Sequence, residues 1–246
     1  MNVAILGGSR GMGRALAREL VERGHDVFLW GRNLEDLKRS AQDLETRASS
    51  HRGVHVGFCD LDKTESFLPA LSEASAALGA IDAVVVTAGS FALQDTLEQD
   101  VELCRQLLNT NFTQTILFCE QARKHLLEQG GGTLCVFSSV AGDRGRKPVI
   151  VYGATKAGLS YYLEGLDHKF HGQGLTVIDV KPGFVKTGMT QGLKPPPFAG
   201  EPQEVAKQVA KALVAPKPVV YTPAIWRWVM CVIRRLPRFI MRRIGF

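Results

Sequence analysis

Short apolar segments alternate along this chain with longer segments in which apolar residues recur every three or four positions. Several of the short segments are apolar throughout, which is typical of parallel strands that are covered on both faces. The predicted strands are 3–6, 27–30, 54–59, 83–86, 133–137, 176–180 and 219–221. The predicted helical segments are 14–22, 34–47, 65–78, 93–128, 152–170 and 204–214. Strands that alternate with helices in this way build a doubly wound parallel sheet through right-handed crossovers.

The same alternation predicts how the chain is divided. No linker interrupts it, so we expect a single α/β domain with about seven parallel strands over residues 1–222. Residues 223–246 follow as an amphipathic helical tail. Within the domain, residues 184–200 are irregular and contain three consecutive prolines. We interpret this segment as a substrate loop that closes over the site, lined by Met189, Leu193 and Phe198, although a plain surface connection is the alternative.

Apolar and basic residues of the tail fall on different faces of a helix. At 100° per residue, one face carries Ile225, Val229, Val232, Leu236 and Ile240, and the opposite face carries Arg227, Arg234, Arg235, Arg238 and Arg242. Arg243 breaks the pattern, and Pro237 is expected to kink the helix. Tryptophans with interleaved arginines are typical of a helix in a membrane interface. An apolar face that packs on the body or on a second subunit gives the same pattern, so these alternatives stay open.

The net charge of +6 belongs to this tail. Residues 221–246 contain six arginines and no acidic residue, which leaves the rest of the chain neutral. A neutral body argues against a nucleic-acid-binding face, and the tail lacks polar residues that read bases. We therefore expect no nucleic-acid partner.

The cysteines and the amino terminus indicate the compartment. Five scattered cysteines are typical of thiols in a reducing compartment, not of a disulfide framework. Met1 leads directly into an apolar strand, which leaves no room for a signal peptide, and no apolar run approaches the roughly 20 residues of a spanning helix. We expect a cytoplasmic protein, with contact to a membrane surface left open. His51, His55 and Cys59 are four residues apart, but on a strand this spacing does not converge, so no metal site is predicted.

A glycine-rich segment connects the first strand to the first helix. Gly7, Gly11 and Gly13 permit a tight turn and a close approach of the backbone, and the N-terminus of the helix attracts a pyrophosphate. Between a strand and a helix of a βαβ unit, such a cluster predicts a dinucleotide site. NAD sites usually carry an acidic residue at the end of the second strand. Here Arg32 stands there and Arg10 lies in the glycine loop, so we predict NADP(H) in preference to NAD(H), because two guanidinium groups suit a 2′-phosphate. That both arginines are solvated loop residues is the alternative.

A serine, a tyrosine and a lysine follow the fifth strand. Ser139 lies where this strand ends, and ligands of open α/β sheets bind at such ends. Tyr152 and Lys156 are four residues apart and share one face of a helix. An ammonium beside a phenol favours the phenolate, so we expect Lys156 to lower the pKa of Tyr152 from about 10 toward neutrality. Tyr152 would then exchange protons at physiological pH.

Together with the glycine loop and the strand order, these residues make residues 2–222 resemble the short-chain dehydrogenase/reductase family, classical type. The resemblance implies a Rossmann-type domain in which Ser139 orients the substrate oxygen and Tyr152 passes it a proton. It also implies that Lys156 tunes Tyr152 and holds the nicotinamide ribose, and that Asn111, in "NTNFTQT", anchors a water that links Lys156 to solvent. Plainer roles for Ser139, as a turn cap, and for Asn111, as a helix cap, stay open.

The resemblance also implies which residues bind the cofactor. They are Gly7, Ser9, Arg10, Gly11, Met12, Gly13, Arg32, Asp60, Leu61, Ala88, Gly89, Tyr152, Lys156, Pro182, Gly183, Val185 and Thr187. Among them, Asp60 is expected to hold the adenine and Thr187 to meet the carboxamide or phosphates. The chain departs from the family in two places, at Leu6 before the glycine loop and at "VTAG" (residues 86–89), and both departures are expected to lose hydrogen bonds that brace loops.

The predicted function is an NADP(H)-dependent oxidoreductase that transfers hydride between nicotinamide and a carbonyl or alcohol substrate. The substrate is expected to be small and apolar or lipid-like. The family resemblance implies a homodimer or homotetramer. A catalytically silent NADP(H)-binding sensor or membrane-tethered scaffold is the alternative, although such proteins lose catalytic residues that this chain keeps.

Overall fold

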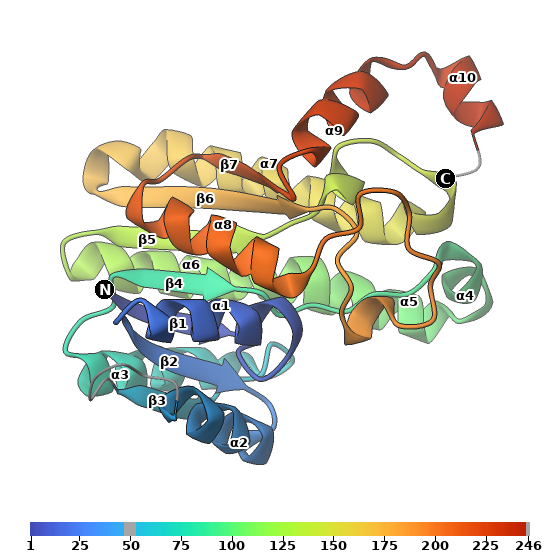
Figure 1. Cartoon of the computed structure of the whole chain (residues 1–246). Coiled ribbons are helices and arrows are strands. Elements are labelled where there is room, and N and C mark those ends of the chain that lie inside the picture. Colours follow the sequence, from blue (N-terminus) through green and yellow to red (C-terminus); the bar gives the residue numbers. More distant parts are fainter. Residues whose placement is uncertain (47–52, 245–246) are drawn as a thin grey trace.

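The structure, a computed structural model, describes residues 1–46 and 53–244 (Figure 1). Seven strands of the described residues form one parallel sheet, in the order β3-β2-β1-β4-β5-β6-β7. The strands are β1 (Asn2–Leu6), β2 (Asp26–Gly31), β3 (Val54–Phe58), β4 (Ala83–Val86), β5 (Gly132–Phe137), β6 (Leu175–Pro182) and β7 (Val219–Thr222). The predicted doubly wound sheet is confirmed. The direction in which strands are added to the sheet reverses at β1. This reversal places the glycine-rich loop after β1 beside the loop after β4.

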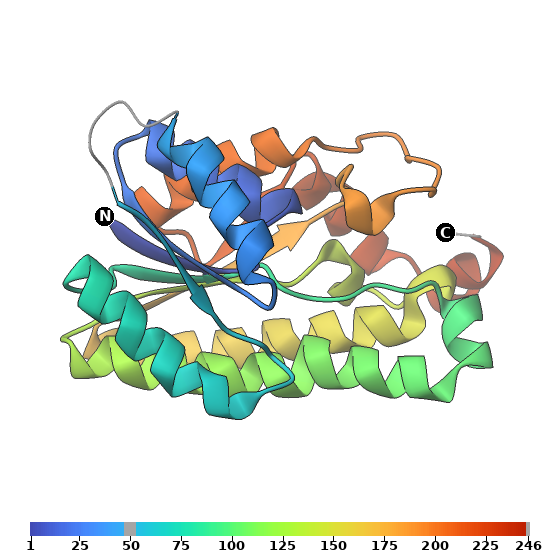
Figure 2. The ribbon, with the colours of Figure 1, turned by 90° about the horizontal axis from the view of Figure 1, so that it is seen from below.

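Helices cover both faces of the sheet (Figure 2). On one face lie α1 (Gly11–Glu22), α2 (Leu34–Glu45) and α8 (Pro202–Val214), and on the other lie α3 (Phe67–Leu78), α6 (Thr115–Glu128) and α7 (Ile150–Phe170). Alternate residues of each strand enter the two cores, so that Val3 and Ile5 pack under α1 while Ala4 and Leu6 pack on the opposite side. Burial on both faces explains why these strands are apolar throughout.

Helix boundaries differ from the prediction at a few places. The helix expected over 34–47 ends at Glu45, and Arg47 and His51 lie outside the described residues. The segment 93–128 divides into α4 (Gln94–Gln99), α5 (Val101–Leu108), a π-helical turn (Asn109–Gln114) and α6. Asp100 starts α5 as its N-cap, because its Oδ1 accepts a hydrogen bond from Leu103 N at 2.9 Å. The π-turn buries Asn111, and such turns often mark functional sites.

The tail forms α9 (Trp226–Arg235) and α10 (Arg238–Arg243) at the β7 edge of the sheet (Figure 1). Pro237 separates the two helices, as the N-cap of α10. One face of α9 packs on the body, but it is not the apolar face identified in the sequence. Trp226, Met230 and Ile233 are buried, while Ile225 and Val232 are 41% and 62% exposed. Within the described part of the chain, no helix combines the length and the apolar character needed to cross a membrane.

Candidate active site

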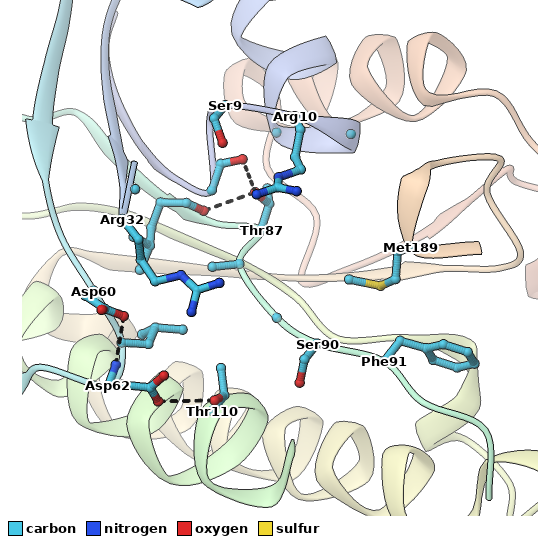
Figure 3. A pocket seen from close by; sticks show the side chains of 18 of the residues that line it. Ser9, Arg10, Arg32, Asp60, Asp62, Thr87, Ser90, Phe91, Thr110 and Met189 are labelled. Carbon is cyan, nitrogen blue, oxygen red and sulfur yellow. Dashed lines mark hydrogen bonds between the residues drawn. The ribbon is translucent and has the colours of Figure 1, made fainter. Parts of the chain in front are cut away.

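A cleft of about 1280 Å³ lies at the carboxyl ends of strands β1 to β4 (Figure 3). Its walls are the loops after these strands, parts of α5 and residues 187–191. Small-molecule sites commonly enclose about 300–1,000 Å³, so this cleft has room for a dinucleotide and a second small molecule. Of the residues predicted to bind the cofactor, those that line the cleft are Gly7, Ser9, Arg10, Gly11, Met12, Gly13, Arg32, Asp60, Leu61, Ala88, Gly89 and Thr187.

Two glycines let the loop after β1 pass close to the loop after β4. Gly7 has a φ of 97°, and a Cβ there would lie 2.6 Å from Thr87 Oγ1. A Cβ at Gly13 would overlap the carbonyl oxygen of Gly7. Thr87 also braces this loop, because its hydroxyl lies 3.0 Å from Leu6 O and 3.3 Å from Gly7 O. The expectation that "VTAG" loses the bracing hydrogen bonds was therefore wrong: threonine supplies them.

The N-terminus of α1 suits a pyrophosphate. Its N-cap, Arg10, makes no side-chain capping hydrogen bond, and the first turn holds no acidic residue. The first backbone N–H groups of a helix have no partner inside the helix and carry the positive end of its dipole. Because Gly11, Met12 and Gly13 line the cleft, this uncapped end borders the cavity. The residues present thus fit the phosphates of a dinucleotide.

Two arginines approach the same cleft from different loops. Arg10 and Arg32 are exposed residues of its lining, and Figure 3 shows both side chains extending into it. The residue after Arg32, Asn33, does not replace the missing carboxylate, because its Oδ1 caps α2 by accepting from Glu35 N at 3.0 Å. Asp60, after β3, is beside the cleft as expected, and its Oδ1 accepts from Asp62 N at 3.2 Å. The arginines thus give the cleft a cationic wall at the ends of β1 and β2.

The structure brings Ser139, Tyr152 and Lys156 together at the end of β5. Ser139 is buried, and its Oγ accepts from Ala141 N at 3.1 Å, which is the turn-capping role left open above. The Lys156 ammonium donates to Phe137 O at 3.0 Å and lies 5.8 Å from the centre of the Tyr152 ring. Tyr152 also meets Phe91 edge to face, at 5.0 Å between ring centres.

This cluster adjoins the cleft. Phe91 and Gly89 both line the cleft, and a Cβ at Gly89 would lie 3.8 Å from Lys156 Nζ. The cluster therefore lies next to the cleft, with Phe91 and Gly89 between them. Phe91 was missed in the sequence, although its place two residues after the "TAG" loop was an available signal.

Burial controls the charges of this cluster. Burial raises the pKa of Tyr152 to about 12. A hydrogen bond with Ser139 and the charge of the Arg146 guanidinium act in the opposite direction, but they are weaker. Burial lowers the pKa of Lys156 to about 8, while the Asp179 carboxylate acts in the opposite direction. The pKa of Tyr152 is therefore raised and not lowered as expected, because desolvation of the phenolate outweighs the Ser139 hydrogen bond and the Arg146 charge.

Asn111 fixes the loop next to Lys156. It is fully buried, its Nδ2 donates to Ser90 O at 2.7 Å, and its Oδ1 accepts from Ser90 N at 2.7 Å. A Cβ at Gly89 would lie 3.1 Å from Asn111 Oδ1. The helix-capping alternative was wrong, because Asn111 lies inside the π-turn and not at its start.

Five predicted cofactor residues do not line the cleft: Tyr152 and Lys156, which belong to the cluster beside it, and Pro182, Gly183 and Val185. Val185 is buried in the core under α1 and α8, Gly183 is covered by the indole of Trp226, and Pro182 offers its carbonyl oxygen to Ser139 Oγ at 3.4 Å. Thr187 does line it, and its side chain would lie 3.9 Å from a Cβ at Gly11. The turn after β6 therefore faces Ser139 and the tail.

The predicted substrate loop reaches the cleft with only part of its length. Met189 lines the cleft, as expected. Leu193 instead lines a separate hollow of about 460 Å³, and Phe198 is exposed. The loop is anchored where Val185 and Gly200 form a bridge.

Comparison with known proteins agrees with this geometry. The profile of the short chain dehydrogenase family matches residues 1–197. An uncharacterized oxidoreductase of Mycobacterium tuberculosis (strain ATCC 25618 / H37Rv) is 35% identical, over 98% of this chain and 96% of the relative. The 3-oxoacyl-[acyl-carrier-protein] reductase of Homo sapiens is 32% identical, over 87% of this chain and 91% of the relative.

Solved structures share the fold. A short-chain type dehydrogenase/reductase from Mycobacterium ulcerans has a TM-score of 0.81 at 22% identity, with 89% of this chain and 86% of that chain covered. The sheet, the cleft and the sequence relatives therefore lead to one conclusion. The chain belongs to the short-chain dehydrogenase/reductase family, and it is an oxidoreductase that acts on CH–OH or C=O groups with a nicotinamide cofactor.

Proposed function

We propose that the protein is an NADP(H)-dependent reductase of apolar, lipid-like carbonyl compounds, reversible as an alcohol dehydrogenase. The observation that carries this proposal is the continuity between a dinucleotide-sized cleft with a cationic wall and the cluster of Ser139, Tyr152 and Lys156. Arg10 and Arg32 support NADP(H), because guanidinium groups pair with phosphate and the end of β2 carries no carboxylate.

The proton chemistry favours reduction. A bound nicotinamide supplies the hydride that reduces the carbonyl carbon. With a pKa of about 12, the Tyr152 phenol keeps its proton at neutral pH, and this neutral form is the one that donates to the substrate oxygen. Ser139 orients that oxygen, and Tyr152 regains its proton from solvent afterwards. Lys156 holds the ribose and stabilises the transient phenolate.

Relatives and side chains support an apolar carbonyl substrate. Carbonyl reductase family member 4 of Xenopus tropicalis is 31% identical over 87% of this chain and 91% of the relative. This relative is named as a carbonyl reductase, and the human relative is named as a reductase of 3-oxoacyl groups on acyl-carrier protein, which also contain a carbonyl group. In this chain Phe91 and Met189 give the cleft an apolar wall beside Tyr152.

We also propose that the outer face of the tail contacts an anionic membrane surface. Trp228, Val232 and Phe239 are 67%, 62% and 60% exposed although they are large and apolar. Residues 221–246 add six arginines and no acidic residue, so this surface complements lipid headgroups with negative charge.

The reductase proposal is tested by NADPH oxidation with ketones of increasing chain length, using the wild type and Tyr152→Phe. We expect wild-type turnover that increases with chain length. Tyr152→Phe should lower kcat by about 100- to 10,000-fold, because it removes the general acid, while NADPH still binds. Wild-type protein that binds NADPH and turns over none of these ketones would contradict the proposal and favour the sensor alternative.

A further inference from the structure

Two cations just before Tyr152 hold the tail. Arg144 Nη2 donates to Leu236 O at 2.7 Å, and Lys147 Nζ donates to Arg242 O at 2.7 Å. These carbonyl groups lie at the ends of α9 and α10, where helices have unpaired carbonyl oxygens and a partial negative charge. Both cations belong to residues 140–151, which we call the serine–tyrosine loop because it joins Ser139 to Tyr152.

An apolar contact attaches α9 to the same region. Trp226 and Met230 pack with Val140 of the serine–tyrosine loop and with Phe184. The indole of Trp226 lies directly against Gly183, where a Cβ would overlap the ring, and its Nε1 donates to Phe198 O at 3.2 Å. The tail thus contacts the loop after β5, the turn after β6 and the substrate loop.

A buried polar chain forms a third attachment. The Asp143 carboxylate accepts from Lys181 Nζ and from the Tyr221 hydroxyl, each at 2.7 Å. Its side chain is 3% exposed, so this pair is protected from water. Arg234 of α9 hydrogen-bonds to Tyr221 in turn. Charge pairs in such a dry environment are costly to break, because one charge is then left buried and uncompensated.

Arg146, which lies between Arg144 and Lys147 in the chain, acts on the Tyr152 phenol. Arg146 is largely buried, and its charge favours the phenolate of Tyr152. The other groups that act on these two residues are Ser139, which hydrogen-bonds to Tyr152, and Asp143, which acts on Arg146. Lys156 faces the Tyr152 ring from the same helix. Because Arg144 and Lys147 flank Arg146 in the chain, fixing them to the tail fixes Arg146 as well.

We infer that the C-terminal tail is a positioning element of the active site: through Arg144 and Lys147 it holds in place the serine–tyrosine loop, which carries Arg146 and joins Ser139 to Tyr152. This inference rests on the proposed reductase function. The dinucleotide cleft is lined by other segments, namely the loops after β1 to β4, α5 and residues 187–191. Residues 140–151 do not line this cleft, so releasing them from the tail should impair the chemical step and leave cofactor binding nearly unchanged.

The test compares the double variant Arg144→Ala/Lys147→Ala with the matched control Arg227→Ala/Arg243→Ala, which removes two exposed arginines of the tail region. Turnover of a soluble ketone, NADPH affinity by fluorescence, and amide hydrogen exchange of residues 140–151 are measured without lipid. We expect the loop variant to lose roughly 10- to 100-fold in kcat, as misplaced catalytic groups do. Its NADPH affinity should stay within about twofold of the control, and exchange in residues 140–151 should increase.

The pH profile separates positioning from a general loss of structure. Alcohol oxidation needs the phenolate of Tyr152, so withdrawal of Arg146 raises the pKa of Tyr152 and moves the oxidation profile to higher pH. The conservative variant Arg144→Lys/Lys147→Arg keeps both donors and should restore kcat and the profile. Unchanged kcat and exchange in the loop variant, or a parallel loss of NADPH affinity, would overturn the inference. Absence of wild-type turnover would instead contradict the proposed reductase function, and amide exchange would still test the positioning.

Discussion

At the residue scale, the site depends on charges whose solvation the fold has changed. Spacing alone correctly places the Tyr152 and Lys156 side chains near one another, because residues four apart share a helix face. Spacing does not reveal how much water surrounds them. In the structure burial dominates, so the phenol is a weaker acid and the ammonium a stronger acid than in water.

Lys156 should therefore make stability depend on pH. Its pKa is about 8 in the folded protein and 10.5 ordinarily. Between these values the unfolded chain binds the proton that the folded chain has lost, so this residue makes the free energy of unfolding increase with pH. Below pH 8 the buried charge costs up to about 3 kcal/mol. Lys156→Met should consequently be more stable than the wild type at pH 7, by an amount that shrinks toward pH 10.

Urea unfolding of both proteins at pH 7, 8, 9 and 10 checks this prediction. The measured quantity is the difference in the free energy of unfolding between the two proteins at each pH. A difference is needed because burial raises the pKa of the Cys119 and Cys135 thiols, which lowers the stability of both proteins at alkaline pH. If this difference in the free energy of unfolding stays constant from pH 7 to pH 10, the prediction that Lys156 is desolvated is wrong.

The proposed preference for NADP(H) predicts a specific role for Arg32 at the same scale. A charge-assisted contact with phosphate is worth about 1.5–3 kcal/mol, so Arg32→Ala should weaken NADPH binding by about 10- to 100-fold. NADH lacks the 2′-phosphate and is the matched control, and its affinity should change by less than about threefold. Fluorescence titration with both cofactors measures this. An equal loss for NADPH and NADH would contradict the 2′-phosphate contact.

At the scale of elements, the sequence pattern predicted strands better than it predicted the end of the chain. Short apolar runs such as Ala83–Val86 are readily interpreted as strands, because a strand that is covered on both faces is apolar at every position. The packing face of the tail was harder to predict, because apolar residues occur on several sides of α9. More than one face of this helix therefore fits an amphipathic pattern. The face that packs is chosen by a distant partner: Trp226 fits where Gly183 has no Cβ.

Loop bracing shows the same limit. The departure at "VTAG" looked like a loss of bracing hydrogen bonds, yet the Thr87 hydroxyl reaches Leu6 O and Gly7 O. Contacts between residues about 80 positions apart in sequence depend on the strand order and on the length and conformation of the side chain. Local motifs identify the candidate site, while such tertiary contacts determine how rigid it is.

At the scale of the whole molecule, the proposed membrane contact uses a different face of the tail from the one that packs on the body. Its inner face carries Trp226, Met230 and Ile233 against the body, and its outer face presents Trp228 and Val232 to solvent. A lipid surface bound to the outer face would therefore leave the inner contacts intact. An apolar substrate dissolved in that surface would then be near the cleft at high local concentration.

Vesicle binding tests this arrangement. Trp30 and Trp226 are buried and Trp228 is exposed, so a blue shift of tryptophan emission on binding reports mainly Trp228. We expect binding to vesicles with anionic lipid, at least about tenfold weaker binding to neutral vesicles, and weakening by salt. Trp228→Ser/Val232→Ser should lose the binding and keep the turnover of a soluble ketone. The control Leu68→Ser removes an exposed apolar residue from α3, and it should bind as the wild type does. If the double variant binds vesicles normally but sediments as a smaller species than the wild type, the outer face joins two copies of the chain and the membrane proposal is wrong.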